Sequence, residues 1–148
     1  MEQRSEQLNS SNLGSRERQY QSVFAQAQGS LGTLDYAAGL LVFAYNWENP
    51  QLMPSIQLGH ALSYQYFVFA NYSHGNRVPS WTEMYYTDPS NVGNPNLQPE
   101  FSNAAELGYR YNPAQYNSKW YFWKADAALF YRQHTNMIDW VRETSSVS

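Results

Sequence analysis

Three glutamates in the second half of the chain are the side chains whose type and spacing come closest to supporting catalysis. Glu83, Glu100 and Glu106 could in principle supply the carboxylate pair that a glycosidase uses. Carboxylates in loops and at strand ends, however, more often have a structural role. We therefore do not predict an acid–base pair from these residues.

The histidines do not form a recognisable metal site. His60, His74 and His134 are scattered, and none has a second histidine or a carboxylate at metal-ligand spacing. The chain also lacks a nucleophile elbow, a glycine-rich phosphate loop and a zincin motif. The sequence thus predicts no catalytic, metal-binding or cofactor-binding residue, and we expect that the chain is not an enzyme.

Composition excludes further classes of protein. The net charge is -3 and there is no basic run, which argues against a nucleic-acid partner. The absence of cysteine excludes disulfide scaffolds and thiolate metal sites. Aromatic residues make up 17% of the chain, with 13 Tyr and 5 Trp. Because Tyr and Trp combine an apolar body with a polar tip, they suit binding surfaces and membrane interfaces.

No targeting or spanning helix is recognisable. The first residues are polar and charged, and the longest apolar run, residues 40–45, is far too short to cross a bilayer as a helix. Taken alone, this would indicate a cytoplasmic protein. If the chain is a piece of an exported protein, the same observation carries no information about location.

Alternating apolar and polar residues predict strands over most of the chain. We expect an all-β fold of antiparallel up-and-down strands, with about six strands within residues 19–142. Residues 1–18 are expected to form a loop or flexible tail, and residues 143–148 to begin an outer loop. A hairpin turn is expected at residues 29–32 and a loop at residues 46–52.

The face pattern within these strands distinguishes a membrane sheet from a soluble one. In the last expected strand, Lys124, Asp126 and Arg132 lie on one face, opposite a face with aromatic ends and a small aliphatic middle. A lipid-facing wall with a polar lumen behind it has this layout, whereas a soluble sandwich also alternates but rarely ends its core face in Tyr at both margins. The pattern therefore favours part of a transmembrane β-barrel. The apolar face consists of Tyr121, Trp123, Ala125, Ala127, Leu129 and Tyr131.

A long polar and aromatic loop, residues 77–100, separates two of the expected strands. Its prolines fix φ and its asparagines can form side-chain turns onto nearby amides, while Gly93 can take a positive φ. Glu100 opens the next strand, where it could accept hydrogen bonds from loop amides. The residues expected to shape this loop, rather than to contact a ligand, are Arg77, Pro79, Ser80, Glu83, Gly93, Asn94, Pro95, Asn96, Leu97, Pro99 and Glu100.

The aromatic residues of the loop are the better candidates for ligand contact. Trp81, Tyr85 and Tyr86 could grip an apolar or planar ligand from an outer loop. The sequence does not show which way these rings face.

The loop and its flanks carry a set of short segments in a recognisable order. They read YSHG at 72–75, RVPS at 77–80, EMY at 83–85, GNPNLQPE at 93–100, ELG at 106–108 and MIDW at 137–140. Over about residues 53–142 this order and spacing resemble the C-terminal half of the barrel of TonB-dependent outer-membrane receptors. Gly93 to Glu100 is the specific part of the match. Asn76 stands where that family more often has an aromatic residue.

The resemblance implies an active transporter of the bacterial outer membrane for a scarce ligand, such as a ferric siderophore, haem or cobalamin, energised through TonB. The implied partners are the lipid bilayer, the receptor's own plug domain, TonB of the inner membrane and a small molecule that the sequence does not identify. Barrels of this kind close about 22 strands around the plug, so six strands would be an internal fragment of the wall.

Two other interpretations fit the pattern of the strands. One is a small autonomous outer-membrane barrel that acts as an adhesin or a porin. The other is a soluble, aromatic-rich carbohydrate-binding β-domain.

Overall fold

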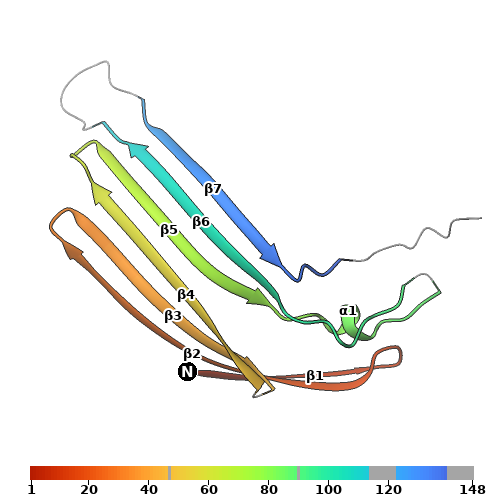
Figure 1. Cartoon of the computed structure of the whole chain (residues 1–148). Coiled ribbons are helices and arrows are strands. Elements are labelled where there is room, and N and C mark those ends of the chain that lie inside the picture. Colours follow the sequence, from red (N-terminus) through yellow and green to blue (C-terminus); the bar gives the residue numbers. More distant parts are fainter. Residues whose placement is uncertain (47, 90, 114–122, 140–148) are drawn as a thin grey trace, which may run out of the picture.

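The strands form one curved antiparallel sheet in which each strand pairs with the next along the chain (Figure 1). The computed structural model describes residues 1–46, 48–89, 91–113 and 123–139. The predicted all-β, up-and-down fold is confirmed, with seven strands instead of about six. The elements are β1 (Glu2–Ser10), β2 (Gly14–Leu31), β3 (Leu34–Tyr45), β4 (Glu48–Ala61), β5 (Tyr66–Arg77), α1 (Trp81–Tyr85), β6 (Glu100–Tyr111) and β7 (Ala125–Thr135).

The long β5–β6 loop lies at the opposite end of the sheet from the β2–β3 and β4–β5 turns. The β2–β3 turn, where Gly32 has a φ of 65°, lies at the same end as the tight β4–β5 connection. The β1–β2 turn and the long β5–β6 loop with α1 lie together at the other end, at the lower right of Figure 1. Residues 77–100 therefore extend from one end of the sheet, beside a β1–β2 turn that is itself short.

The prediction of a loop or flexible tail over residues 1–18 is wrong. β1 pairs with β2 from Glu2 opposite Ser22 to Ser10 opposite Gly14, and Gly14 closes the turn with a φ of 75°. β1 is mostly exposed and polar on both faces, so it carries no apolar alternation that could reveal it. Backbone hydrogen bonds to β2 form this strand in the absence of a buried face.

The expected loop at residues 46–52 is mostly strand. β4 begins at Glu48, and the register of β3 against β4 shifts between Phe43 and Tyr45. Asn46 and Asn49 adopt positive φ values of 51° and 40°, which asparagine tolerates. Pairing between β4 and β5 starts only at Ser55, so Pro50 and Pro54 lie where one edge of β4 is free, as proline in a strand requires.

The sheet has two chemically different faces. In β5–β7 the register aligns Ala70, Leu107 and Leu129 in one row of the apolar face, with Leu107 and Leu129 61% and 73% exposed. The polar face carries Asn71 and Glu106 in neighbouring strands. We call these the apolar face and the polar face throughout.

The sheet does not have the core of a soluble sandwich. Among the described residues, the buried apolar side chains are Met53, Met84 and Pro79. No helix in the described part of the chain is both long and apolar enough to cross a membrane. The expected outer-loop start at residues 143–148, and Tyr121 and Trp140 with them, lie outside the described residues.

Candidate functional site

Arg77 clamps the two ends of the long loop together. Its Nε and Nη2 donate to Glu100 Oε2 and Oε1 at 2.8 and 3.0 Å, a bidentate contact across the paired ends of β5 and β6. Its Nη1 also donates to both carboxylate oxygens of Glu83, at 2.9 and 3.0 Å. The pKa of Arg77 is raised by these hydrogen bonds, first from Glu100 and then from Glu83. One guanidinium thus joins the last residue of β5, the first of β6 and helix α1.

A capping box starts helix α1. Ser80 Oγ accepts a hydrogen bond from the Glu83 amide at 3.2 Å, and Glu83 Oε2 accepts from the Ser80 amide at 2.7 Å. Burial acts to raise the pKa of Glu83, but the hydrogen bonds from Ser80 and Arg77 outweigh it and lower the pKa. The sequence analysis did not predict this helix, although the Ser80-x-x-Glu83 spacing is the signal that could have revealed it.

Glu100 connects the loop to the segment that follows β7. Besides Arg77, its carboxylate accepts a hydrogen bond from the backbone amide of Ile138. These two donors lower the pKa of Glu100 to about 2. The expected donors were amides of the loop itself, and the actual ones come from the end of β5 and from beyond β7.

Gly93 is required for a close backbone approach and not for a positive φ. A Cβ at this position would lie 2.8 Å from Met84 C and from Tyr85 N, and Gly93 is not among the glycines with positive φ. Its amide donates to Tyr86 O at 2.7 Å. The expectation of a positive φ at Gly93 is therefore wrong, because the returning chain presses directly against the backbone of α1.

The rest of the returning segment continues this turn. The Asn94 amide donates to Glu83 O at 3.1 Å, and its side-chain oxygen accepts from the Asn96 amide at 2.9 Å. The predicted side-chain turn is thus confirmed for Asn94. Pro95 and Asn96 form the exposed turn, and the chain then leads through Leu97 and Pro99, both half-buried, into β6.

Two of the three candidate ligand-contacting aromatics face arginines of β2. The Arg18 guanidinium carbon lies 4.1 Å from the Trp81 ring centroid, and that of Arg16 lies 4.0 Å from the centroid of Tyr85. Both distances fall within the range of cation–π contacts. Tyr86 is half-buried and ends α1, where its amide donates to Thr82 O. The structure thus brings Trp81 and Tyr85 onto the β1–β2 hairpin.

Arg18 is a site residue that the sequence analysis missed. It is only 3% exposed, and its Nη1 donates to the carbonyl oxygen of Pro79, itself buried, at 2.9 Å. Because residues 1–18 were expected to be a tail, nothing in that interpretation placed Arg18 beside the loop. An arginine in a polar strand gives no sequence signal for burial.

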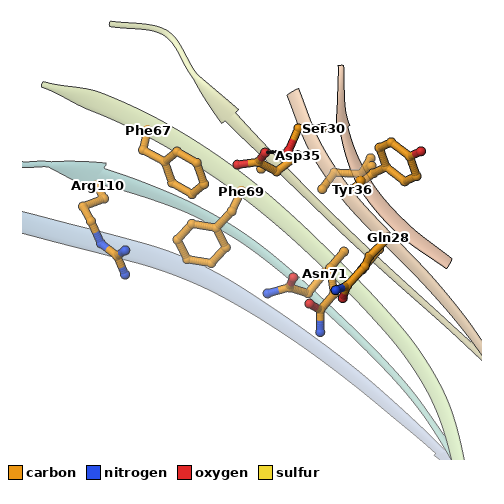
Figure 2. Close-up of a pocket in the computed structure, with 13 residues that line it drawn as sticks. Gln28, Ser30, Asp35, Tyr36, Phe67, Phe69, Asn71 and Arg110 are labelled. Atoms are coloured by element: carbon orange, nitrogen blue, oxygen red, sulfur yellow. Dashed lines mark hydrogen bonds between the residues drawn. The ribbon is translucent and has the colours of Figure 1, made fainter. Parts of the chain in front are cut away.

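The polar face holds a hollow of about 590 Å³ near the β2–β3 turn. Figure 2 shows Phe67 and Phe69 side by side on it, with polar side chains around them. The rings lie over Gly59 and Gly108, since a Cβ on these glycines would fall 2.6 Å from Phe67 Cζ and 2.1 Å from Phe69 Cζ. The polar residues labelled around the rings are Gln28, Ser30, Asp35, Asn71 and Arg110.

The glutamates considered above as an acid–base pair are engaged in other contacts. Glu83 and Glu100 bind Arg77, and Glu106 accepts a hydrogen bond from Asn71 at 2.9 Å. Within the described residues, no group of three or more His, Asp or Glu side chains could hold a metal ion. What the site can do is fix the long β5–β6 loop in place.

Comparison with known proteins gives the same architecture. Residues 3–148 match the sequence model of the family described as TonB dependent receptor-like, beta-barrel. The crystal structure of the siderophore receptor PirA from Pseudomonas aeruginosa is similar to this chain, with a TM-score of 0.77 and 18% identity over 95% of this chain. The chain covers 29% of that receptor's length. No curated protein matches the chain.

The family match extends over nearly all of the chain, beyond the segments on which the sequence resemblance depends. It includes β1, which the sequence pattern did not reveal, and the whole loop clamped by Arg77. A receptor family also agrees with the expectation that the chain is not an enzyme. The chain belongs to the TonB dependent receptor-like, beta-barrel family.

Proposed function

We propose that the chain is a sector of the wall of an outer-membrane receptor that imports a scarce ligand with energy delivered through TonB. The observation that carries this proposal is the two-faced sheet. Its apolar face exposes Leu107 and Leu129 and is bordered by Tyr72 and Tyr131 at one margin and Tyr109 towards the other. A lipid-facing wall has this layout, with the polar face turned to the lumen.

The free edges of the sheet support a larger barrel. Within the described residues, β1 pairs only with β2, and β7 pairs only with β6. Unpaired edges are costly in a membrane because backbone groups there have no water to bind. We propose that further strands of the same receptor continue the wall on both sides.

The proposed partners follow from this placement. They are the lipid bilayer of the bacterial outer membrane, the receptor's own plug domain within the lumen, and TonB of the inner membrane. Among the ligands, a ferric siderophore is the first candidate, since the similar solved structure is that of a siderophore receptor. Haem and cobalamin are the next candidates.

The long loop serves this receptor as a fixed part of its rim. Arg77, Glu83 and Glu100 join both ends of the loop and its helix through hydrogen bonds of 2.8 to 3.0 Å. Trp81 and Tyr85 are occupied by arginines of β2, which leaves their rings less available to a ligand. We assign an architectural role to the loop for these reasons.

Adjacent residues of β7 test the orientation of the wall. In the complete receptor, Leu129→Arg places a charge on the apolar face, where it should cost about 2–4 kcal/mol in a bilayer. Ala128→Arg, one residue away and on the polar face, is the matched control and should fold into membranes normally. Equal insertion yields for the two variants would contradict a lipid-facing apolar face.

Uptake by living cells tests the transport function. Deleting the gene that encodes this chain should abolish the uptake of one labelled ligand among a panel of ferric siderophores, haem and cobalamin. Inactivating TonB should abolish the same uptake. If the gene deletion abolishes ligand entry but inactivation of TonB has no effect, the protein is instead a small porin-like barrel. A protein that stays in aqueous solution without detergent would indicate a soluble domain.

A further inference from the structure

Three aromatic rings surround the guanidinium group of Arg18. The guanidinium carbon lies 4.1 Å from the ring centroid of Trp81, 5.4 Å from that of Tyr45 and 5.9 Å from that of Tyr20. These rings come from α1, β3 and β2, so three separate elements contribute to one cluster. Each distance lies within the reach of a cation–π contact.

Within the part of the chain that the structure describes, the charge of Arg18 is buried without an ion pair. Arg18 is 3% exposed, and none of the ion pairs found among the described residues includes it. Its Nη1 donates to Tyr20 Oη at 3.0 Å, and this hydroxyl donates to Glu6 Oε2 at 3.1 Å. A buried cation is costly unless its surroundings replace water, and here ring faces provide much of the replacement.

The same guanidinium contacts two residues of the long loop directly. Besides the carbonyl of Pro79, Arg18 reaches Met84 Sδ with Nη2 at 3.5 Å. Met84 is 6% exposed and is the buried side chain of α1. The arginine is therefore enclosed between β2 on one side and the loop on the other.

We propose that Tyr20, Tyr45 and Trp81 form an aromatic cage for a guanidinium ion, which Arg18 fills from within the protein. Arg18 is then a positioning residue: it fastens residues 77–100 to the β1–β2 hairpin and makes the two outer connections one unit. Without its side chain, the empty cage retains the chemistry to bind a free guanidinium ion. The inference depends on the local contacts and is independent of the proposed transport function.

Chemical rescue tests the cage in the complete protein in detergent. The amides of Met84 and Tyr86 donate hydrogen bonds within the α1 turn. Arg18→Ala should raise the hydrogen-exchange rates of these two amides roughly tenfold and leave the rates of the β5–β6 amides unchanged. Guanidinium chloride at about 20 mM, far below the molar range that unfolds proteins, should restore slow exchange. Sodium chloride at the same concentration should not. Arg132→Ala removes an exposed arginine of β7, a strand that contributes nothing to the cage, and serves as the control.

Two results would overturn the cage. The first is that the exchange rates of α1 amides do not change in Arg18→Ala. The second is that guanidinium chloride does not restore slow exchange, or that sodium chloride restores it equally well. If Arg18→Ala does not fold, Trp81→Leu opens the cage from the loop side and leaves the arginine in place. The α1 amides of Trp81→Leu should exchange faster, as in Arg18→Ala, and guanidinium should not slow them. Wild-type exchange rates in Trp81→Leu would also refute the proposal.

Discussion

Arg77 and Glu100 are paired twice over, once by the backbone and once by their side chains. They are the outermost register pair of β5 and β6, and two parallel hydrogen bonds of 2.8 and 3.0 Å join guanidinium and carboxylate. The ends of a loop of more than twenty residues are thus closed at one point. Because the same guanidinium also holds Glu83 of α1, this pair sets the position of the helix as well as that of the stem.

Replacing Arg77 by lysine should loosen the loop although the charge is kept. Lysine cannot reproduce the planar fork that binds Glu100 through two nitrogens and Glu83 through a third, so we expect a loss of about 1 kcal/mol in local stability. Hydrogen exchange of loop amides in the complete receptor measures this loss. Arg110→Lys is the matched control: its pair with Asp126 has one contact of 2.7 Å between exposed side chains and should matter by less than about 0.5 kcal/mol.

Acidification should remove the contribution of Glu100 well below neutral pH. Its pKa is about 2 in the folded protein, below the ordinary value of 4.5, so folding favours the ionised carboxylate. The resulting stability is complete above about pH 4.5 and is lost as the pH falls towards 2. The difference in melting temperature between the wild type and Glu100→Gln should therefore shrink steadily over this interval. A difference that stays constant from neutral pH to about pH 2 would contradict the depressed pKa.

The fold was predictable wherever one face of a strand is apolar. β5, β6 and β7 follow the expected alternation, and the register aligns Leu107 with Leu129 as the pattern implies. β1 was not predicted, because polar residues occupy both of its faces. The start of β4 was not predicted, because Pro50 and Asn49 are turn residues in most contexts. They can lie in a strand here because that edge of β4 is not paired with β5.

The candidate site was predictable in its members but not in its contacts. Arg77, Glu83 and Glu100 were identified from the loop sequence, yet nothing in their spacing shows that one guanidinium binds both carboxylates. Arg18 lies 61 residues from Pro79, whose carbonyl it binds. A contact of that separation depends on how far β2 extends past β3, which the local pattern does not encode.

Asn76 should be replaceable by an apolar residue without loss of stability. Its Nδ2 is buried and has no hydrogen-bond partner within the described residues, and an unsatisfied buried donor costs about 1–3 kcal/mol. Asn76→Leu should therefore be neutral or stabilising by about 1 kcal/mol in thermal or denaturant unfolding. Asn103→Leu is the contrasting control, since Asn103 Oδ1 accepts from Tyr72 Oη and contacts His74 Nδ1, both at 2.9 Å. A larger loss for Asn76→Leu than for Asn103→Leu would show that the Asn76 amide has a partner.

Alanine at Gly93 should displace the loop from α1, whereas alanine at Gly75 should be tolerated. At Gly93 the new Cβ would lie 2.8 Å from backbone atoms of Met84 and Tyr85, and backbone cannot move aside as a flexible side chain can. Overpacking of this kind costs about 1–3 kcal/mol. At Gly75 the nearest atom is Ser102 Oγ at 3.9 Å, an ordinary contact. Neither glycine has a positive φ, so the pair isolates steric fit from backbone strain.

The readout for this pair is exchange at the Gly93 and Asn94 amides, which bond to Tyr86 O and Glu83 O. Gly93→Ala should speed exchange at both positions and at α1, and Gly75→Ala should leave them unchanged. Because the Arg77–Glu100 hydrogen bonds do not involve the backbone atoms of Met84 and Tyr85 that Gly93 approaches, hydrogen bonding at Glu100 should survive in Gly93→Ala. Equal exchange rates in the two variants would mean that the returning segment does not press on α1. The close backbone approach would then not explain why residue 93 is glycine.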